Sequence, residues 1–107
     1  MEISQYQIVL VNLDPTRGSE IKKTRPCVVI SPNEMNIQLN NVIVAPVTTS
    51  KKSYPTRVKI KHGQQIRQIV VDQIRTLDKV MLIKNLGSLT ASEIRSLKSI
   101  IKETFVD

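Results

Sequence analysis

The sequence predicts a mainly β fold, a small barrel or strongly bent sheet, followed by one C-terminal helix. Short runs rich in Val, Ile and Leu are separated by turn residues along most of the chain. Residues 57–61 alternate strictly between basic and β-branched side chains, as a strand with one buried face does. The last segment has a helix start signal followed by apolar residues at helical spacing.

Several segments have the composition of short strands, which is typical of small barrels. The predicted strands are residues 7–13, 26–31, 42–48, 57–61, 66–71 and 80–84. Residues 31–35 predict a turn or the start of a short helix. Pro46 has no N–H to donate to a ladder, so we expect it at a sheet edge or a bulge.

The C-terminal helix is predicted over residues 90–104. Thr90 and Glu93 form a capping box, in which each side chain can bond the backbone N–H of the other residue. The apolar positions that follow are Ile94, Leu97, Ile101 and Phe105. This stripe predicts a helix packed on the barrel, with Phe105 in the core.

Length and charge limit the classes of function. The 107 residues are the size of one domain, predicted to span 1–107, and 40% apolar residues suffice for one small core. The net charge of +7 and the pI of about 9.9 favour an anionic partner, most simply nucleic acid. A basic surface without a specific partner is the alternative. The apolar runs are too short for a membrane span, so no membrane partner is expected.

Cys27 is the single cysteine of the chain, so no intrachain disulfide can form. Its apolar neighbours predict a buried, inert thiol rather than a reactive nucleophile. A lone cysteine and the lack of a signal-peptide pattern favour the cytoplasm.

The strongest charge feature is residues 51–67, which contain six Lys or Arg and no Asp or Glu. Such a segment can bind along a phosphate backbone. The alternative is an edge strand whose lysines prevent aggregation. Exposed rings for base stacking are scarce, and only Tyr54 and Tyr6 could serve.

The sequence signals no metal site, no phosphate-binding glycine loop and no Ser/His/Asp arrangement. His62, the single histidine, lies in Lys-His-Gly and predicts an exposed turn residue. A histidine-based nuclease is therefore not expected.

Five separated blocks resemble the MazF/PemK family of toxin endoribonucleases. They are Asp14–Glu20 (Asp-Pro-Thr-Arg-Gly-Ser-Glu), Thr24–Pro26 with Val28–Pro32, Ala45–Thr49, Tyr54–Thr56, and Asp72–Lys79 (Asp-Gln-Ile-Arg-Thr-Leu-Asp-Lys). The resemblance implies an SH3-like barrel with a C-terminal helix, a homodimer, and cofactor-free, metal-independent cleavage of single-stranded RNA. It also implies a cognate antitoxin with an acidic C-terminal segment, and contact with DNA only through that antitoxin.

By the motif matches, Arg25 and Thr48 are expected at the scissile phosphate. The 2′-hydroxyl of RNA would attack the adjacent phosphorus and leave a 2′,3′-cyclic phosphate and a 5′-hydroxyl. A planar guanidinium can bind two phosphate oxygens, and a threonine hydroxyl can donate to a non-bridging oxygen. The structural alternative for Arg25 is an ordinary charged loop residue. For Thr48 it is a hydroxyl that bonds the backbone at the end of a strand.

The proton acceptor is the open question of this chemistry. A guanidinium with a pKa above about 12 accepts a proton poorly. Glu20 and Asp72 are chemically easier acceptors, with hydrogen bonding in a loop or turn as the alternative. The expected RNA-binding residues are Arg17, Ser19, Lys22, Lys23, Lys51, Lys52, Tyr54 and Gln73. Gln73 can pair with a base edge or can brace a turn as a buried amide.

Three positions depart from the family pattern. Tyr6-Gln7 replaces an expected Gly-Asp or Gly-Glu, Ser19 replaces the histidine of a plasmid-borne branch, and Val70 replaces an arginine of that branch. The Arg/Asp mechanism proposed for that branch therefore does not transfer, and the Arg25/Thr48 version fits better. Two other functions stay open: a non-catalytic topoisomerase poison like the CcdB group, and an RNA-binding barrel that does not cleave.

Overall fold

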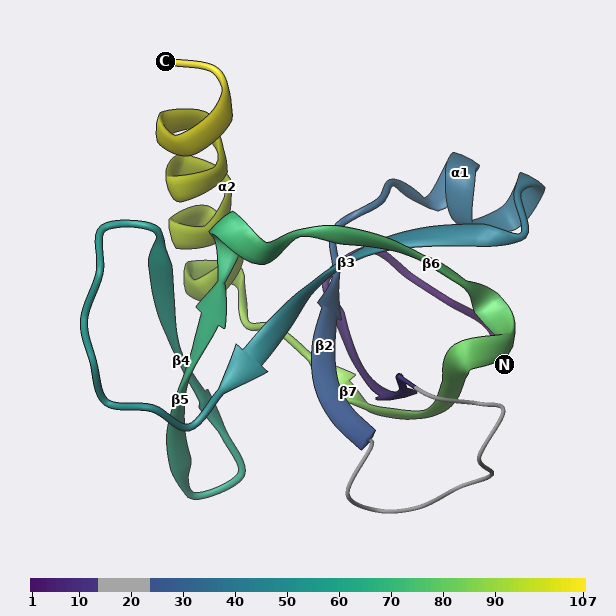
Figure 1. The fold of residues 1–107 in the computed structure, drawn as a ribbon, viewed down its shortest axis with the longest axis horizontal. Coiled ribbons are helices and arrows are strands. Elements are labelled where there is room, and N and C mark those ends of the chain that lie inside the picture. Colours follow the sequence, from purple (N-terminus) through teal and green to yellow (C-terminus); the bar gives the residue numbers. More distant parts are fainter. Residues whose placement is uncertain (14–23) are drawn as a thin grey trace.

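A computed structural model describes residues 1–13 and 24–107 (Figure 1). Its elements, in chain order, are β1 (Gln7–Asn12), β2 (Thr24–Val29), α1 (Asn33–Gln38), β3 (Asn41–Thr48), β4 (Arg57–His62), β5 (Gln65–Val70), the 3-10 turn η3 (Val71–Gln73), β6 (Arg75–Asp78), the 3-10 turn η4 (Lys79–Met81), β7 (Leu82–Ser88) and α2 (Ala91–Phe105). The strands form one antiparallel sheet in the order β4-β5-β3-β2-β1-β7, and β6 also pairs with β3. The sheet curls into a half-barrel with a C-terminal helix, which confirms the predicted fold class.

Strand β3 changes partner along its length. Residues 41–44 pair with β6, whereas Val47 and Thr48 pair with β5. Pro46 lies between these two ladders and is fully enclosed within the sheet, opposite Cys27 of β2. Of the two predicted settings for Pro46, the sheet edge was wrong, because β3 lies between β5 and β2. The missing N–H of Pro46 falls where the ladder to β6 and β5 is interrupted.

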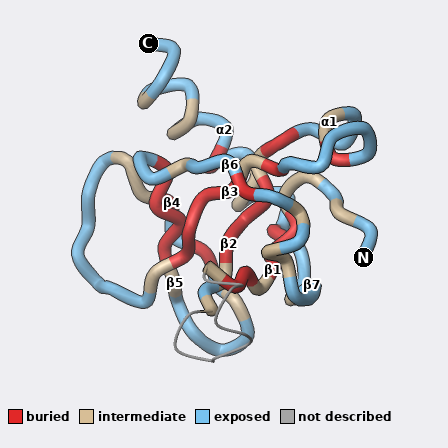
Figure 2. Tube along the Cα trace, turned by 45° about the vertical axis from the view of Figure 1, so that its right-hand side comes forward, coloured by how far each residue is buried: buried red, intermediate tan, exposed pale blue. Residues whose placement is uncertain are grey.

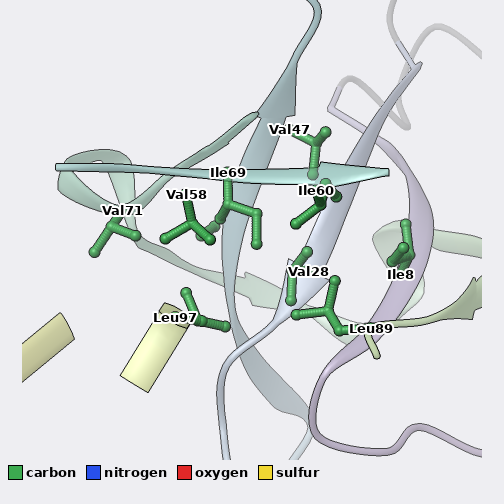
Figure 3. Packing of buried hydrophobic residues seen from close by; sticks show 10 residues of the cluster. Ile8, Val28, Val47, Val58, Ile60, Ile69, Val71, Leu89 and Leu97 are labelled. Carbon is green, nitrogen blue, oxygen red and sulfur yellow. The ribbon is translucent and has the colours of Figure 1, made fainter. Parts of the chain in front are cut away.

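The sheet has two apolar faces, since alternate side chains of a strand point to opposite sides. One face packs under α2, where Leu97 meets the inner side chains of β4 and β5 (Figure 3). The other face fills the half-barrel with the side chains of Val9, Val11, Cys27, Val29, Val42, Val44 and Leu77. Figure 2 shows buried segments, coloured red, along the central strands and the exposed β3–β4 loop, residues 49–56, outside them.

Helix α2 begins as predicted. Thr90 accepts a hydrogen bond from the backbone N–H of Glu93, and Glu93 accepts one from the backbone N–H of Thr90. Phe105 was predicted in the core but is 57% exposed. Phe105 is the last residue of α2, and the C-terminal end of this helix extends beyond the strands (Figure 1).

Three further predictions differ from the structure. Strand β6 was not predicted, because Leu77 is the single buried side chain in an otherwise polar segment of four residues. The last strand covers 82–88 rather than 80–84. His62 is not an exposed turn residue: it ends β4, is half-buried, and its Nε2 lies 3.0 Å from the carbonyl oxygen of Leu86. Within the described residues, no helix has the length and apolar content needed to span a bilayer.

Candidate nucleic-acid interface

A row of polar and basic side chains crosses the sheet on the face opposite α2. The register pairs Thr48 of β3 with Gln68 of β5, and Gln68 with Lys59 of β4. Directly opposed residues of antiparallel strands place their side chains on the same face. Thr48, Gln68 and Lys59 therefore lie side by side across three neighbouring strands.

Arg25 extends this row onto β2. The β2–β3 register pairs Cys27 with Pro46, and two further residues along each strand lead to Arg25 and Thr48. Because side chains two apart share a face, Arg25 and Thr48 lie on the same face at the same end of the two strands. The two residues that the sequence motifs placed at the scissile phosphate therefore share one face of the sheet.

Arg25 is solvent-exposed, and within residues 1–13 and 24–107 it forms no ion pair. A guanidinium without an acidic partner keeps its positive charge available to an anion. Arg75 of β6 is also exposed and pairs with Val44, on the far side of Pro46 from Thr48. Arg25 and Arg75 therefore flank Cys27, and both charges act on its thiol.

Cys27 is buried, as predicted. Burial raises the pKa of the Cys27 thiol from 9.0 to about 11, against the opposing effect of the Arg25 and Arg75 charges. The thiolate needed for nucleophilic attack is therefore scarce at neutral pH.

The Thr48 hydroxyl is oriented by the backbone of the following loop. Its oxygen accepts a hydrogen bond of 3.2 Å from the backbone N–H of Ser50. This is the strand-end role considered as the structural alternative. A hydroxyl that accepts one bond can still donate its own hydrogen. The Thr48 O–H can therefore be directed toward a phosphate oxygen.

Residues 49–56, the β3–β4 loop, are held at both ends. The Gln68 side-chain amide donates 2.8 Å hydrogen bonds to the carbonyl oxygens of Ser50 and Lys52. At the other end, the Arg57 guanidinium lies over the Tyr54 ring, 4.6 Å from its centroid. The loop therefore presents Lys51 and Lys52 to solvent from a fixed framework.

The remaining predicted residues fall in two places. Asp72 is exposed in η3, and its carboxylate accepts a 2.8 Å hydrogen bond from the Thr56 hydroxyl, next to the end of the β3–β4 loop. Gln73 is exposed, so the alternative of a buried bracing amide was wrong. The predicted residues Arg17, Ser19, Glu20, Lys22 and Lys23 lie outside the described residues.

The prediction of basic residues on one strand face is confirmed. Lys59 and Lys61 are exposed, and Val58 and Ile60 between them are buried. Strand β4 is an edge of the sheet, so these lysines also suit the protective role considered as the alternative. In the described residues, no three His, Cys, Asp or Glu side chains gather as a metal site would require.

Sequence reasoning did not identify Gln68 as part of this site. Gln68 is 4% exposed and stands among Ile and Val residues of a strand. A glutamine at a buried strand position must find hydrogen-bond partners, and this was the available signal. Its partners lie 18 and 16 residues earlier in the chain, and only folding brings them beside it.

The fold and the site together define a small basic half-barrel that presents Arg25, Thr48 and Lys59 on one face. The family described as "PemK-like, MazF-like toxin of type II toxin-antitoxin system" matches residues 4–105. The chain is 32% identical to "Endoribonuclease MazF9" of Mycobacterium tuberculosis over 106 residues, which cover 90% of each protein. The protein belongs to this family of toxins.

Two further similarities agree with this assignment. The chain is 33% identical to the "Endoribonuclease toxin MazF" of Escherichia coli over 70 residues, which cover 65% of this chain and 63% of that relative, slightly less than two thirds. Its fold superposes on the solved "Mycobacterium tuberculosis toxin MazF-mt6" with a TM-score of 0.79 at 26% identity, covering 92% of this chain and 95% of the other.

Proposed function

We propose that the protein is the toxin of a toxin–antitoxin pair and acts as a metal-independent, sequence-specific endoribonuclease on single-stranded RNA, with mRNA as its substrate. The observation that supports this most is the shared position of Arg25 and Thr48 at one end of β2 and β3. Family membership and the net charge of +7 agree with an RNA substrate. The activity is carried by one domain over residues 1–107, and mRNA as substrate favours the cytoplasm.

The reaction needs charge stabilisation on the phosphoryl oxygens, a proton acceptor at the 2′-oxygen and a proton donor at the leaving 5′-oxygen. As the 2′-oxygen forms its bond to phosphorus, the bond from phosphorus to the 5′-oxygen breaks, leaving a 2′,3′-cyclic phosphate. Arg25 binds two phosphate oxygens and stabilises the charge that develops on them. Thr48 donates its hydroxyl hydrogen to a non-bridging oxygen, while its own oxygen accepts the hydrogen bond from the backbone N–H of Ser50.

The proton of the 2′-hydroxyl requires an acceptor, and the leaving 5′-oxygen takes its proton from solvent water. Glu20 and Asp72 are the two proposed acceptors, since an ionised carboxylate accepts a proton far more readily than a guanidinium. Asp72→Asn keeps an oxygen for the Thr56 hydroxyl but removes the basic carboxylate. A loss of the acidic limb of the pH–rate profile in either Asp72→Asn or Glu20→Gln would identify the acceptor.

RNA on either side of the cleaved bond is bound by the basic and polar loops. Lys51, Lys52 and Tyr54 of the β3–β4 loop, together with Gln73, are exposed and suited to this role. Arg17, Ser19, Lys22 and Lys23 are proposed to contribute from the β1–β2 segment. The same basic surface would bind an acidic C-terminal segment of the antitoxin and so be blocked to RNA. We propose a homodimer that contacts DNA only through the antitoxin.

The decisive experiment incubates purified protein with mixed-sequence RNA in EDTA. Discrete fragments with cyclic-phosphate ends are expected. The same assay is run on Arg25→Ala, and Arg95→Ala, which removes the same charge at an exposed position of α2, serves as its control. RNA that is shifted on a gel but intact would indicate a binding barrel, and RNA that is unaffected would favour a topoisomerase poison.

A further inference from the structure

A groove lies between the β3–β4 loop and the β4–β5 hairpin, next to Thr48. It consists of two cavities of about 250 and 570 Å³ that share Lys51 and Ile66 as lining residues. Lys59 and Gln68 line the smaller cavity, and Gln64 and Gln65 line the larger one. The larger volume falls within the range of ~300–1,000 Å³ usual for ligand sites. We call this feature the hairpin groove.

The wall of the hairpin groove is held in place before any ligand binds. Gln68 is 4% exposed, and its amide holds the carbonyl oxygens of Ser50 and Lys52 at 2.8 Å each. Ser50 is also fixed through its backbone N–H, which donates to Thr48. Two hydrogen bonds from the buried Gln68 amide hold this loop, so a ligand meets a preformed surface.

The hairpin groove is continuous with the candidate cleavage site. Gln68 stands directly between Thr48 and Lys59 in the register of three adjacent strands. Neighbouring strands are about 4.8 Å apart, so Lys59 lies about 10 Å from the Thr48 strand. An RNA strand whose phosphate contacts Thr48 can therefore place a neighbouring nucleotide over Gln68 and Lys59.

The lining of the hairpin groove matches the parts of a nucleotide. Lys51 and Lys59 supply positive charge, and the residues that line the two cavities include no Asp or Glu. Ile66 is 71% exposed, an unusual state for an isoleucine in a strand, and offers an apolar surface to the face of a base. Gln64 and Gln65 are exposed amides, which can bond both donors and acceptors on a base edge.

We propose that the hairpin groove is a nucleotide subsite that binds the phosphate and base of an RNA residue flanking the cleaved bond. This inference rests on the proposed ribonuclease function. Lys51 and Lys59 bind the phosphate, Ile66 contacts the base, and Gln64 and Gln65 read its edge. The subsite contributes to sequence preference at one position of the cut site.

The test measures binding of a mixed-sequence decamer of 2′-O-methyl RNA, which has no nucleophilic 2′-hydroxyl and so cannot be cleaved. Lys59→Gln is expected to weaken binding about fivefold, and to reduce the slope of log affinity against log salt by about 0.7, the value for one single-strand phosphate contact. Lys98→Gln makes the same charge change at an exposed position of α2, on the other side of the sheet from the groove. This control is expected to leave the affinity and the salt slope unchanged.

A second variant tests the base contact by a different readout. Ile66→Ser is expected to broaden base preference about threefold at one position of the cut site, mapped on a long defined RNA, while other positions stay as in wild type. Because Ile66 and Lys59 are exposed, both variants should fold, which thermal unfolding verifies.

Three outcomes have distinct meanings. A wild type that leaves RNA intact refutes the nuclease function, while the salt slope on uncleavable RNA still reports on the subsite. Identical affinity and slope for wild type and Lys59→Gln overturn the subsite even if cleavage is observed. An unchanged RNA slope combined with weaker binding of an acidic peptide would assign the hairpin groove to a protein partner and also overturn it.

Discussion

The Glu93 carboxylate of α2 accepts a 2.8 Å hydrogen bond from the backbone N–H of Lys61 in β4, 32 residues earlier in the chain. The other carboxylate oxygen completes the capping box with Thr90. One side chain therefore caps the helix and satisfies a backbone donor of an edge strand. Its position locks α2 onto β4, where Leu97 packs into the core.

Removing this carboxylate should destabilise the fold. Glu93→Ala is expected to lower the free energy of unfolding by about 1–3 kcal/mol, because it removes both a cap and a bond to β4. Urea titration followed by circular dichroism measures the loss. Glu103→Ala, an exposed position on the same helix, should change stability by less than about 0.5 kcal/mol. Equal losses in the two variants would contradict the bridging role.

Arg25 should be needed for the chemical step rather than for folding. Arg25→Ala is expected to reduce kcat about a hundredfold or more, since it removes the charge that stabilises the phosphoryl oxygens. Arg25→Lys should lie between this variant and wild type, because an ammonium cannot grip two oxygens in a plane. Single-turnover cleavage of a defined RNA gives the rates. Retained cleavage by a folded Arg25→Ala protein would refute the assignment.

The hydroxyl of Thr48 can be tested apart from its shape. Thr48→Val keeps the branched side chain but removes the donor, and we expect kcat to fall by about tenfold or more. Thr48→Ser retains the hydroxyl and should stay within a few-fold of wild type. The pair of variants is informative because both keep β3 intact, so equal activity of the two would remove Thr48 from the mechanism.

The buried thiol of Cys27 should make stability decline at alkaline pH. The thiol pKa rises from 9.0 unfolded to about 11 folded, so the contribution is complete below pH 9 and is lost as the pH rises toward 11. The expected loss is roughly 2 kcal/mol over that interval. Urea titrations at pH 8, 9, 10 and 11 measure it. Cys27→Ala should show a shallower decline, and parallel curves for the two proteins would contradict the shift.

Gln68 should control the order of the β3–β4 loop. Gln68→Leu removes both amide bonds to the loop, and we expect trypsin to cleave after Lys51 or Lys52 about tenfold faster, in line with the loss of two hydrogen bonds. The matched control is Gln38→Leu on exposed α1, which should leave this cleavage rate unchanged. Unchanged proteolysis in Gln68→Leu would show that the loop is held by other contacts.

The sequence determined the features that depend on neighbours along the chain. The capping box of Thr90 and Glu93 needs only a helical turn, and the alternation of Val58, Lys59 and Ile60 needs only a pleated strand. Both were predictable because local backbone geometry places those side chains. The motifs around Arg25 and Thr48 are also runs of consecutive residues, so the order of side chains along the chain was enough to indicate the family.

Tertiary structure decided which distant residues share a surface. Strand β6 forms by pairing with residues 41–44 of β3. His62 is half-buried because Leu86 of β7 lies beside it. The row from Thr48 through Gln68 to Lys59 depends on the register of three strands, which no local pattern specifies. Phe105 is exposed because the sheet ends before the helix does. The sequence alone gives the side-chain types and their spacing along each segment. Cross-strand neighbours are set only when separate segments pair.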